Sequence, residues 1–265
     1  MSHRELLDLA VRFAVEAGEL LLDWFERPAE GVGTKSTPTD LVSNADRESE
    51  ALLMKRIAEA RPGDGIVAEE GGREESTSGL RWIVDPLDGT VNFLYGIRQW
   101  GVSIAVEDGR GAVAACVHNP IAEETFSATR DGGARLNGRP IAVSGVTDLT
   151  QALIGTGFAY DATVRREQAE VVAGVLPRVR DIRRMGSAAL DFCAVACGRL
   201  DGFYERGLAH WDRAAGELIV TEAGGLVGEL SAPGPTNQTD EPGPVDYGFF
   251  CAGPGLFDSL RTLLA

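Results

Sequence analysis

One short stretch of sequence limits what this chain can fold into, because it joins a buried strand to two closely spaced carboxylates. The apolar run over 81–84 predicts a short buried strand, and Pro86 is expected to end it by removing a donor from the hydrogen-bond ladder. Asp85 and Asp88 follow directly, and a turn held by Pro86 can aim both carboxylates and the Leu87 carbonyl at one point. Hard divalent cations are bound by such all-oxygen clusters. The stretch therefore indicates a metal site just after a strand.

The next residues predict an anion site beside the metal site. Asp88-Gly89-Thr90 has the pattern of a short helix or turn start, with Asp88 as the cap. The Gly89 and Thr90 amide groups would then be free to hold an anion, and glycine has no side chain to obstruct its approach. Metals on one side and an anion on the other describe a phosphate-ester site. The alternative is an ordinary turn, since Asp-Pro and Asp-Gly are common turn dipeptides and Asp88-Gly89 could close a hairpin.

Composition narrows the class of ligand. The 265 residues suffice for one large α/β domain or two small ones, and 44% of them are apolar, as in globular proteins. The formal net charge of −15 disfavours nucleic acid and anionic membrane surfaces, whose phosphates it would repel. An anionic substrate would need cations in its site, although most of the acidic charge is expected on a solvated surface.

Targeting segments and cysteine usage predict the compartment. No apolar run reaches membrane-spanning length, and the amino terminus has no signal-like stretch. Cys116, Cys193, Cys197 and Cys251 lie in apolar surroundings without zinc-type spacing, so they are expected as free thiols. These features predict a cytoplasmic, reduced protein with no membrane partner.

Hydrophobic periodicity predicts alternating helices and strands along the chain. Helices are expected at 6–24, 44–61, 165–176, 187–198, 212–223 and after 252, and strands at 65–68, 81–84, 101–107, 112–118, 125–129, 153–157, 181–184, 201–205 and 247–252. Residues 231–246, rich in Pro, Gly and acids, are expected to form an exposed loop. The fold class is therefore α/β, with an α+β half over 1–146 and an α/β half over 147–265 packed as one domain.

Carboxylates stand at the ends of several of these elements. They are Asp46 and Asp212 at helix starts, and Glu69, Glu70, Asp85 and Asp88 at strand ends. Active sites of α/β sheets gather where strand ends and helix starts meet. So many carboxylates would repel one another strongly without cations, and their convergence predicts bound metal.

The segments that carry these carboxylates resemble the inositol monophosphatase family. The similar segments are, in order, Lys35-Ser36-Thr37-Pro38-Thr39-Asp40-Leu41-Val42 with Asp46, Glu69-Glu70, Asp85-Pro86-Leu87-Asp88-Gly89-Thr90, Trp211-Asp212-Arg213-Ala214-Ala215-Gly216 and Thr221-Glu222-Ala223-Gly224-Gly225. They cover nearly the whole chain in the right order. The resemblance implies a layered sandwich of alternating helices and sheets, of the inositol monophosphatase and fructose bisphosphatase type. It also implies dependence on two or three Mg²⁺ ions, inhibition by Li⁺, and a homodimer.

Carried over residue by residue, the resemblance implies three sets of site residues. The metal ligands would be Glu69, Asp85, the Leu87 carbonyl, Asp88 and Asp212, with the neighbouring Glu70 turned the other way by strand alternation. The catalytic residues would be Thr90, Asp46 and Glu69, with Thr90 and Asp46 orienting or deprotonating the attacking water. The substrate would contact the Gly89 and Thr90 amides, Ser187, Ala188, Glu205 and Asp212.

The resemblance further implies a phosphoric monoester hydrolase acting on a small polyol phosphate, most closely inositol-1-phosphate. Glu205 matches the family residue that hydrogen-bonds sugar or inositol hydroxyls; the alternative is a surface acid at a strand end. Arg183 and Arg184 could reach a second phosphate or face solvent, and we favour solvent. His210 could touch the pocket edge or be structural, as a lone histidine more often is.

Other activities share this metal core. Related families hydrolyse fructose-1,6-bisphosphate, histidinol phosphate or adenosine bisphosphates, and this compact chain fits the last of these poorly. A hypothesis of another class is a non-catalytic regulator that keeps the fold and binds RNA-polymerase-type or other protein partners. The set Glu69, Asp85, Asp88, Thr90 and Asp212 favours the enzyme, because a pure binding module does not need these residues.

Overall fold

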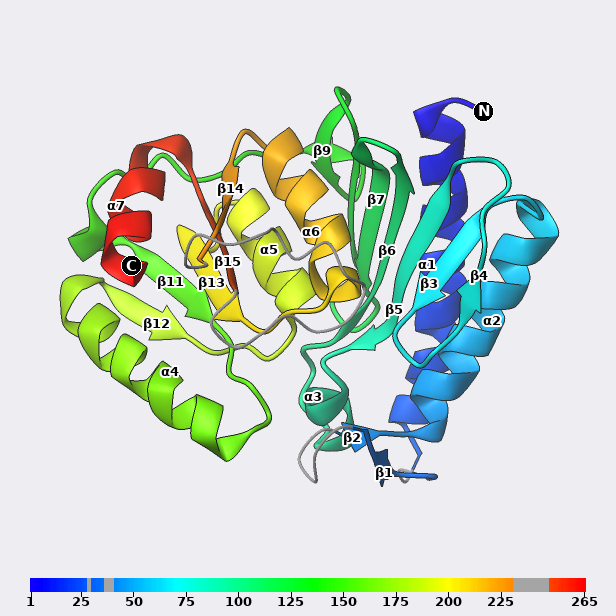
Figure 1. Ribbon diagram of the computed structural model, residues 1–265, viewed down its shortest axis with the longest axis horizontal. Coiled ribbons are helices and arrows are strands. Elements are labelled where there is room, and N and C mark those ends of the chain that lie inside the picture. Colours follow the sequence, from blue (N-terminus) through cyan, green and yellow to red (C-terminus); the bar gives the residue numbers. More distant parts are fainter. Residues whose placement is uncertain (28–29, 36–40, 231–247) are drawn as a thin grey trace.

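The computed structural model describes residues 1–27, 30–35, 41–230 and 248–265 (Figure 1). The loop expected at 231–246 and residues 36–40 of the amino-terminal motif lie outside the described residues. None of the described helices is long and apolar enough to cross a membrane.

The larger of two main sheets has eight strands in the order β10-β9-β8-β7-β6-β5-β3-β4. Along the chain they are β3 (Gly65–Ala68), β4 (Arg73–Glu74), β5 (Arg81–Asp88), β6 (Gly101–Asp108), β7 (Gly111–Asn119), β8 (Glu124–Thr129), β9 (Gly133–Leu136) and β10 (Arg139–Pro140). Strands β3 and β5 are parallel, whereas the other neighbours are antiparallel. The carboxyl ends of β3 and β5 therefore lie side by side at one edge, which is where the predicted metal ligands follow.

Two long helices, α1 (His3–Phe25) and α2 (Asn44–Ala60), cover the outer face of this sheet (Figure 1). A capping box starts α1, because the Glu5 amide donates to the Ser2 hydroxyl and the Ser2 amide donates to the Glu5 carboxylate. The apolar stripe of α1 is buried on the sheet, and the Phe13 ring lies 5.9 Å from that of Trp82 on β5. The predicted first helix is confirmed. A short pair, β1 (Gly33–Thr34) and β2 (Leu41–Val42), precedes α2.

The smaller sheet has five strands in the order β12-β11-β13-β15-β14. They are β11 (Leu153–Thr156), β12 (Asp181–Arg183), β13 (Gly202–Arg206), β14 (Leu226–Glu229) and β15 (Gly248–Ala252). The remaining helices are α3 (Thr90–Leu94), α4 (Ala162–Val175), α5 (Ala188–Ala196), α6 (His210–Glu222) and α7 (Pro254–Leu264).

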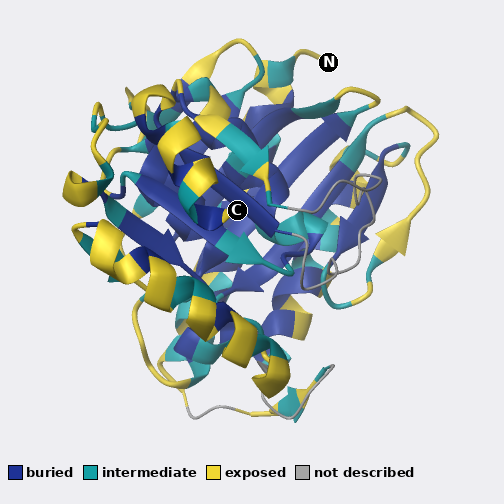
Figure 2. Cartoon of the chain, turned by 60° about the vertical axis from the view of Figure 1, so that its left-hand side comes forward, coloured by how far each residue is buried: buried dark blue, intermediate teal, exposed yellow. Residues whose placement is uncertain are grey.

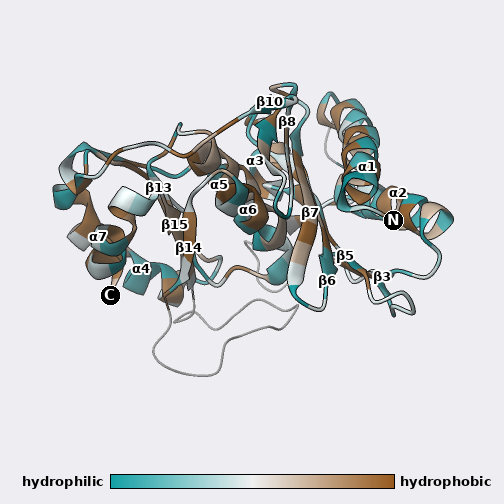
Figure 3. Cartoon of the chain, turned by 90° about the horizontal axis from the view of Figure 1, so that it is seen from above, coloured by the Kyte–Doolittle hydropathy of each residue, from teal (hydrophilic) through white to brown (hydrophobic). Residues whose placement is uncertain are grey.

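The elements stack in alternating helix and sheet layers. Seen from above, α5 and α6 lie between the two sheets, α1 and α2 lie outside the larger sheet, and α4 and α7 lie outside the smaller one (Figure 3). The central core joins the layers, since Ile83 and Val117 of the larger sheet and Phe203 of the smaller sheet belong to one cluster with Phe192 and Ile219. The inner layers are buried, and the outer helices are exposed on their outer faces (Figure 2). The predicted α/β layered sandwich is confirmed, whereas the single-domain assignment stays a prediction.

Two local predictions were wrong, and one strand was not predicted. Strand β5 does not stop before Pro86 but runs to Asp88, because its register against β6 shifts between Asp85 and Asp88 and this bulge accommodates the proline. The cap of α3 is Gly89 at φ 92°, not Asp88, whose side chain turns to another helix. No strand was expected at 226–229, where β14 pairs with β15.

Candidate metal and phosphate site

The predicted acidic residues converge at the edge where β3 and β5 end. Asp46 comes from the first turn of α2, Glu69 follows β3, and Asp85 and Asp88 are the last carboxylates of β5. Asp212 comes from the first turn of α6, which lies on the opposite face of the sheet from α2 (Figure 1). Two helix starts and two strand ends therefore meet at one place.

The carboxylates of this cluster lie close enough to affect one another's ionisation. Burial raises the pKa of Asp85, and the negative charges of Glu69, Asp88 and Asp212 raise it further. Burial likewise raises the pKa of Asp212, with Glu69 and Asp88 adding to the effect. Such a group is costly to keep ionised without a counter-charge. These carboxyl groups therefore stay ionised only where a positive charge, from a side chain or a cation, lies beside them.

Lys35 supplies one of these positive charges. Its ammonium group lies 2.7 Å from Glu69 Oε1 and 2.5 Å from Glu70 Oε1, so both glutamates face the same lysine. The prediction that strand alternation would turn the two side chains apart was wrong, because β3 ends at Ala68 and both residues lie in the turn after it. Glu70 is further fixed through its amide, which donates to Glu50.

Thr90 and Asp46 form a hydrogen-bonded pair beside the cluster. The Thr90 hydroxyl lies 2.9 Å from Asp46 Oδ1 and 3.1 Å from the Leu87 carbonyl oxygen. The other Asp46 oxygen accepts from the Ser43 amide at 2.8 Å and from its hydroxyl at 2.6 Å. All of these groups are buried. The predicted pairing of a threonine with a carboxylate is confirmed, and Ser43 holds that carboxylate in place.

Asp88 links β5 to the amino end of α5. Its Oδ2 accepts from the Ser187 hydroxyl at 2.5 Å and from the Ala189 amide at 2.8 Å. Burial raises the Asp88 pKa, and these hydrogen bonds lower it. Ser187, predicted at the pocket border, is therefore placed beside the acidic cluster by a contact between residues far apart in sequence.

The Gly89 backbone adopts a conformation and a packing that favour glycine. Its φ is 92°, and a Cβ built there would lie 3.1 Å from the Gln99 carbonyl oxygen and 3.2 Å from that of Gly186. The Asn92 side-chain amide donates to the carbonyls of Gln99 and Met185, which ties α3 to the segment before α5. The Gly89 turn is thus held against the opposite wall of the site.

The donor set suits a hard divalent cation, although the side chains are not arranged around one. Within the described residues, no group of three or more His, Cys, Asp and Glu side chains could hold a metal ion as it stands. The hydrogen bonds explain this: Glu69 faces Lys35, and Asp88 faces Ser187. Buried, mutually repelling carboxylates beside the Leu87 carbonyl nevertheless form the all-oxygen set that Mg²⁺ prefers.

Glu205 lies at the far end of β13, close to the cluster but not part of it. Burial raises its pKa to about 7, with Asp88 adding to the rise and Arg184 opposing it. Its carboxylate rests on the backbone of Gly157, where an added Cβ would lie 1.9 Å from Glu205 Oε2. Glu205 is therefore a half-buried carboxylate near the end of β13, and its role in substrate binding stays a prediction.

Three participants in the site were not predicted as such. Lys35 was named only as part of the amino-terminal family segment, Gly157 was assigned only to a strand end, and Asp191 was not considered. Asp191 is 1% exposed, its Oδ1 has no hydrogen-bond partner among the described residues, and burial raises its pKa well above the usual value. The signal for Asp191 was available, because a carboxylate within the apolar α5 sequence is unusual.

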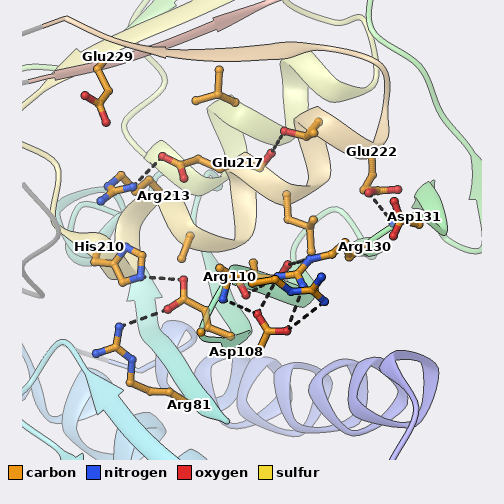
Figure 4. A pocket seen from close by; sticks show the side chains of 18 residues that line it. Arg81, Asp108, Arg110, Arg130, Asp131, His210, Arg213, Glu217, Glu222 and Glu229 are labelled. Carbon is orange, nitrogen blue, oxygen red and sulfur yellow. Dashed lines mark hydrogen bonds and ion pairs between the residues drawn. The ribbon is translucent and has the colours of Figure 1, made fainter. Parts of the chain in front are cut away.

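A hollow of about 790 Å³, separate from the acidic cluster, lies between the β6–β7 hairpin, α6 and β14 (Figure 4). His210 lines it and lies 2.8 Å from Glu107, on which Arg81 also converges. Arg130 is paired with Asp108, and Arg213 with Glu217, in the same way. None of the predicted site residues lines this hollow. Its ion pairs support the structural interpretation of His210.

Comparison with known proteins shows one family across the chain. Residues 2–243 match the model of the inositol monophosphatase family. The sequence is 45% identical over 242 residues to the inositol-1-monophosphatase SuhB of Mycobacterium tuberculosis, covering 88% of this chain and 81% of that protein. It is 40% identical over 228 residues to the Nus factor SuhB of Escherichia coli, covering 85% of each.

Solved structures agree with the sequence comparison. The extragenic suppressor protein suhB of Bartonella henselae superposes with a TM-score of 0.90 at 35% identity, covering 98% of each chain. The inositol monophosphatase of Anabaena superposes with a TM-score of 0.82 at 31% identity, covering 98% of this chain and 95% of that one.

Proposed function

This chain belongs to the inositol monophosphatase family, and we propose that it hydrolyses a phosphate monoester of a small polyol, most closely inositol-1-phosphate, to the polyol and phosphate. The observation that carries this proposal is the Thr90–Asp46 hydrogen bond, set among buried carboxylates that require cations. A hydroxyl paired with a carboxylate at an acidic, anion-accepting turn is suited to activating water, and a binding module would not need it.

The proposed Mg²⁺ ions, two or three in number, would be held by the side chains of Glu69, Asp85, Asp88 and Asp212 and by the Leu87 carbonyl. When bound, they would supply Lewis-acid stabilisation of the attacking water and of the leaving alkoxide. Lys35 would release Glu69 for this role. Sensitivity to Li⁺ belongs to the same proposal.

The residues of the chain would move one proton. Thr90 donates its hydroxyl proton toward Asp46, which leaves the lone pairs of its oxygen to accept a proton from the attacking water. Asp46 is prevented from rotating away by the two hydrogen bonds from Ser43. The Gly89 and Thr90 amides would orient the phosphate so that the water attacks in line.

The leaving polyol would lie between α5 and β13. We assign its contacts to Ser187 and Ala188 at the start of α5, to Glu205 on β13 and to Asp212. The Glu205 carboxylate would accept hydrogen bonds from polyol hydroxyls. A homodimer without nucleic-acid or membrane partners, in the cytoplasm, completes the proposal.

Gly157→Ala tests the role of Glu205 without altering Glu205 itself. The added Cβ would lie about 2 Å from the Glu205 carboxylate carbon and oxygens, and this flexible side-chain end is what must shift. We expect KM for inositol-1-phosphate to rise about 10-fold or more, since a hydrogen bond to a charged group contributes roughly 1.5–3 kcal/mol. The melting temperature should change little. The variant is checked by steady-state kinetics and thermal denaturation.

Gly174→Ala in α4 is the matched control, because an added Cβ there meets nothing within 4 Å. It should leave KM unchanged and stabilise the helix by about 0.5–1 kcal/mol. An unchanged KM in Gly157→Ala would remove Glu205 from the substrate site.

The proposed function is tested by phosphate release from inositol-1-phosphate, fructose-1,6-bisphosphate and histidinol phosphate, each with Mg²⁺ and with EDTA. We expect Mg²⁺-dependent turnover that is fastest on inositol-1-phosphate. Faster turnover of either of the other substrates would leave the proposed Mg²⁺-dependent hydrolysis standing but contradict inositol-1-phosphate as the preferred substrate. The absence of phosphate release from all three substrates would contradict the proposal that this chain is a phosphatase.

A regulatory role is the second candidate, favoured by one observation. Relatives 40% and 38% identical to this chain, from Escherichia coli and Vibrio cholerae, are named Nus factor SuhB. A protein of this kind would bind partners of the transcription machinery whether or not it hydrolysed a phosphate ester. Inactivity on every substrate, together with binding to such a partner, would favour it.

A further inference from the structure

Glu50 is a buried carboxylate next to the turn that carries Glu69. It comes from the second turn of α2, four residues after Asp46, and is 7% exposed. Residues four apart lie on one face of a helix, so Glu50 and Asp46 leave α2 on the same side. Glu50 is not among the proposed metal ligands or catalytic residues. An acid kept this far from water nevertheless needs hydrogen-bond donors.

The donors are two backbone amides of the turn after β3. The Glu70 amide donates to Glu50 Oε2 at 2.7 Å, and the Gly72 amide donates to Glu50 Oε1 at 3.1 Å. One carboxylate therefore holds both ends of a three-residue segment, with Gly71 between them at φ 104°. The Ala68 amide also donates to the Gly72 carbonyl at 2.9 Å, which closes the turn on itself. Because hydrogen bonds to an ionised acceptor are strong, Glu50 fixes this turn relative to α2.

Glu69 is the residue just before the segment that Glu50 holds. Its own amide donates to the Val84 carbonyl at 3.2 Å, so its backbone is tied to β5 on one side and to the held turn on the other. The rotamers open to a side chain depend on its backbone angles. The hydrogen bonds of Glu50 therefore limit the directions in which the Glu69 carboxylate can point.

The same face of α2 holds two further segments of the site. Asp46 accepts from the Thr90 hydroxyl at 2.9 Å, and the Ser49 hydroxyl donates to the Pro86 carbonyl at 2.9 Å. The apolar residues in the later turns of α2 are buried in the core against the larger sheet, which anchors the helix. One anchored helix therefore sets the relative positions of three segments that are separate in sequence.

We propose that Glu50 is a positioning residue, which contacts neither metal nor substrate but fixes the turn after β3 so that the Glu69 carboxylate is in place before Mg²⁺ binds. This inference rests on the Mg²⁺ site of the proposed function. Groups that hold a metal ligand in position typically contribute about 10- to 100-fold to metal affinity. Glu50 therefore acts on Mg²⁺ affinity, and neither on substrate binding nor on the chemical step.

Two substitutions separate this role from a simple effect of charge, since a negative charge near the site attracts cations whatever its geometry. Glu50→Gln keeps the length of the side chain but has one acceptor oxygen beside an NH₂ group, so it can accept from only one of the two amides. Glu50→Asp keeps the charge but is one methylene shorter, which places its oxygens beyond hydrogen-bond distance of at least one amide.

Mg²⁺ affinity is measured by calorimetry without substrate, and kcat and KM for inositol-1-phosphate are measured over a range of Mg²⁺ concentrations. We expect Glu50→Gln and Glu50→Asp each to bind Mg²⁺ about 10- to 100-fold more weakly than wild type. At saturating Mg²⁺, kcat and KM should return to within about 3-fold of wild type, because the proposed ligands and the Thr90–Asp46 pair are unchanged.

Glu59→Gln is the matched control, since it makes the same substitution at an exposed position of the same helix. The Glu59 side chain is 55% exposed and lies 4.0 Å from Lys55 and 3.7 Å from Arg56, and such surface pairs contribute little. This variant should match wild type in Mg²⁺ affinity, kcat and KM.

Three outcomes would overturn the proposal. Wild-type affinity in Glu50→Asp beside weaker binding in Glu50→Gln would assign the effect to charge at a distance. Unchanged Mg²⁺ affinity in both variants, whatever the melting temperature, would leave Glu50 a purely structural role. A loss in kcat or KM that persists at saturating Mg²⁺ would place Glu50 in the chemical step or in substrate binding.

Hydrogen exchange on the wild-type protein tests the held turn without any variant. The Glu70 and Gly72 amides should be protected in EDTA, and Mg²⁺ should change their exchange little, because the turn is fixed before the ion binds. Glu50→Gln should lose the protection of at least one of these amides. Unprotected Glu70 and Gly72 amides in metal-free wild type would contradict the proposal even if both variants failed to fold.

Failure of the proposed function has a different signature, because calorimetry and exchange do not need turnover. Mg²⁺-dependent turnover in wild type, with unchanged Mg²⁺ affinity in both Glu50 variants, would overturn the role of Glu50 alone. Mg²⁺ binding that weakens in the variants, in a protein that releases no phosphate from any substrate, would overturn the phosphatase alone. A wild-type protein that binds no Mg²⁺ would overturn both.

Discussion

Replacing Thr90 by alanine is expected to lower kcat about 10²- to 10⁴-fold while leaving Mg²⁺ affinity near that of the wild type. The reason is that the Thr90 hydroxyl is hydrogen-bonded to Asp46 at 2.9 Å and would be the acceptor of the proton from water. General acid–base groups contribute rate factors of about this size. Thr90 supplies no carboxylate, so metal binding should depend on it little.

The measurement combines single-turnover kinetics with Mg²⁺ titration by calorimetry. Thr90→Ser keeps the hydroxyl and is the matched control, expected to retain most of the activity. Asp46→Asn should show a loss similar to that of Thr90→Ala, and the double variant should be little worse than either, because the two act as one unit. A large loss of Mg²⁺ affinity in Thr90→Ala would instead assign Thr90 to the metal site.

Replacing Asp85 by asparagine is expected to have opposite effects on the metal-free and the metal-loaded protein. Asp85 is buried and faces the charges of Glu69, Asp88 and Asp212, so removing its charge relieves repulsion in the absence of cations. An asparagine can still accept from the Leu87 amide, as Asp85 does at 3.0 Å, and it can also donate to Glu69. We therefore expect the melting temperature in EDTA to rise by several degrees, at about 2–4 °C per kcal/mol for a protein near this size.

With Mg²⁺ we expect the opposite order, in which wild-type protein has a higher melting temperature than Asp85→Asn. Wild-type protein should gain melting temperature as Mg²⁺ is added, because a ligand that binds only the folded state stabilises it. Asp85→Asn should lose most of this gain. The loss of a residue that only hydrogen-bonds to a metal ligand lowers metal affinity roughly 10–100-fold, and the loss of a ligand itself should lower it more. Activity should be nearly abolished.

Asp8→Asn is the control for Asp85→Asn, because the Asp8 side chain is 60% exposed and, among the residues that the structure describes, forms an ion pair only with Arg4. It should change neither the melting temperature in EDTA nor the response to Mg²⁺ appreciably. A melting temperature that falls in EDTA for Asp85→Asn would show that its carboxylate stabilises the metal-free fold, and would contradict the repulsion argument.

Local sequence was sufficient to predict most elements and the positions of the carboxylates that converge. The spacing of Leu6, Phe13 and Leu21 made α1 a helix, and all three residues are buried in the structure. Asp85 and Asp88 were identified as site residues from their position after an apolar run, although the strand itself continues through Pro86. The helix prediction succeeded because periodicity depends on neighbours in the chain, whereas the roles of Asp85 and Asp88 stay predictions.

Only the tertiary structure decided which side chains meet. Arg183 and Arg184 are indistinguishable in sequence, yet one pairs with Asp181 and the other lies over Gly186. Asp88 accepts hydrogen bonds from Ser187 and Ala189, at the start of a helix far along the chain. Lys35 lies between Glu69 and Glu70, which strand alternation alone would have separated, and Gly157 leaves room for the Glu205 carboxylate.

The physical reason is that sequence patterns carry the type and period of each element, whereas the meeting of distant elements depends on how whole layers pack. The larger sheet brings the ends of β3 and β5 together. The packing of α5 and α6 on that sheet brings the starts of these two helices to the same edge. Burial at that meeting point is what turns separate carboxylates into a mutually repelling group with raised pKa values. The sequence by itself determined the donors and the elements that carry them; the tertiary structure determined their partners, their burial and the side of the site that each one faces.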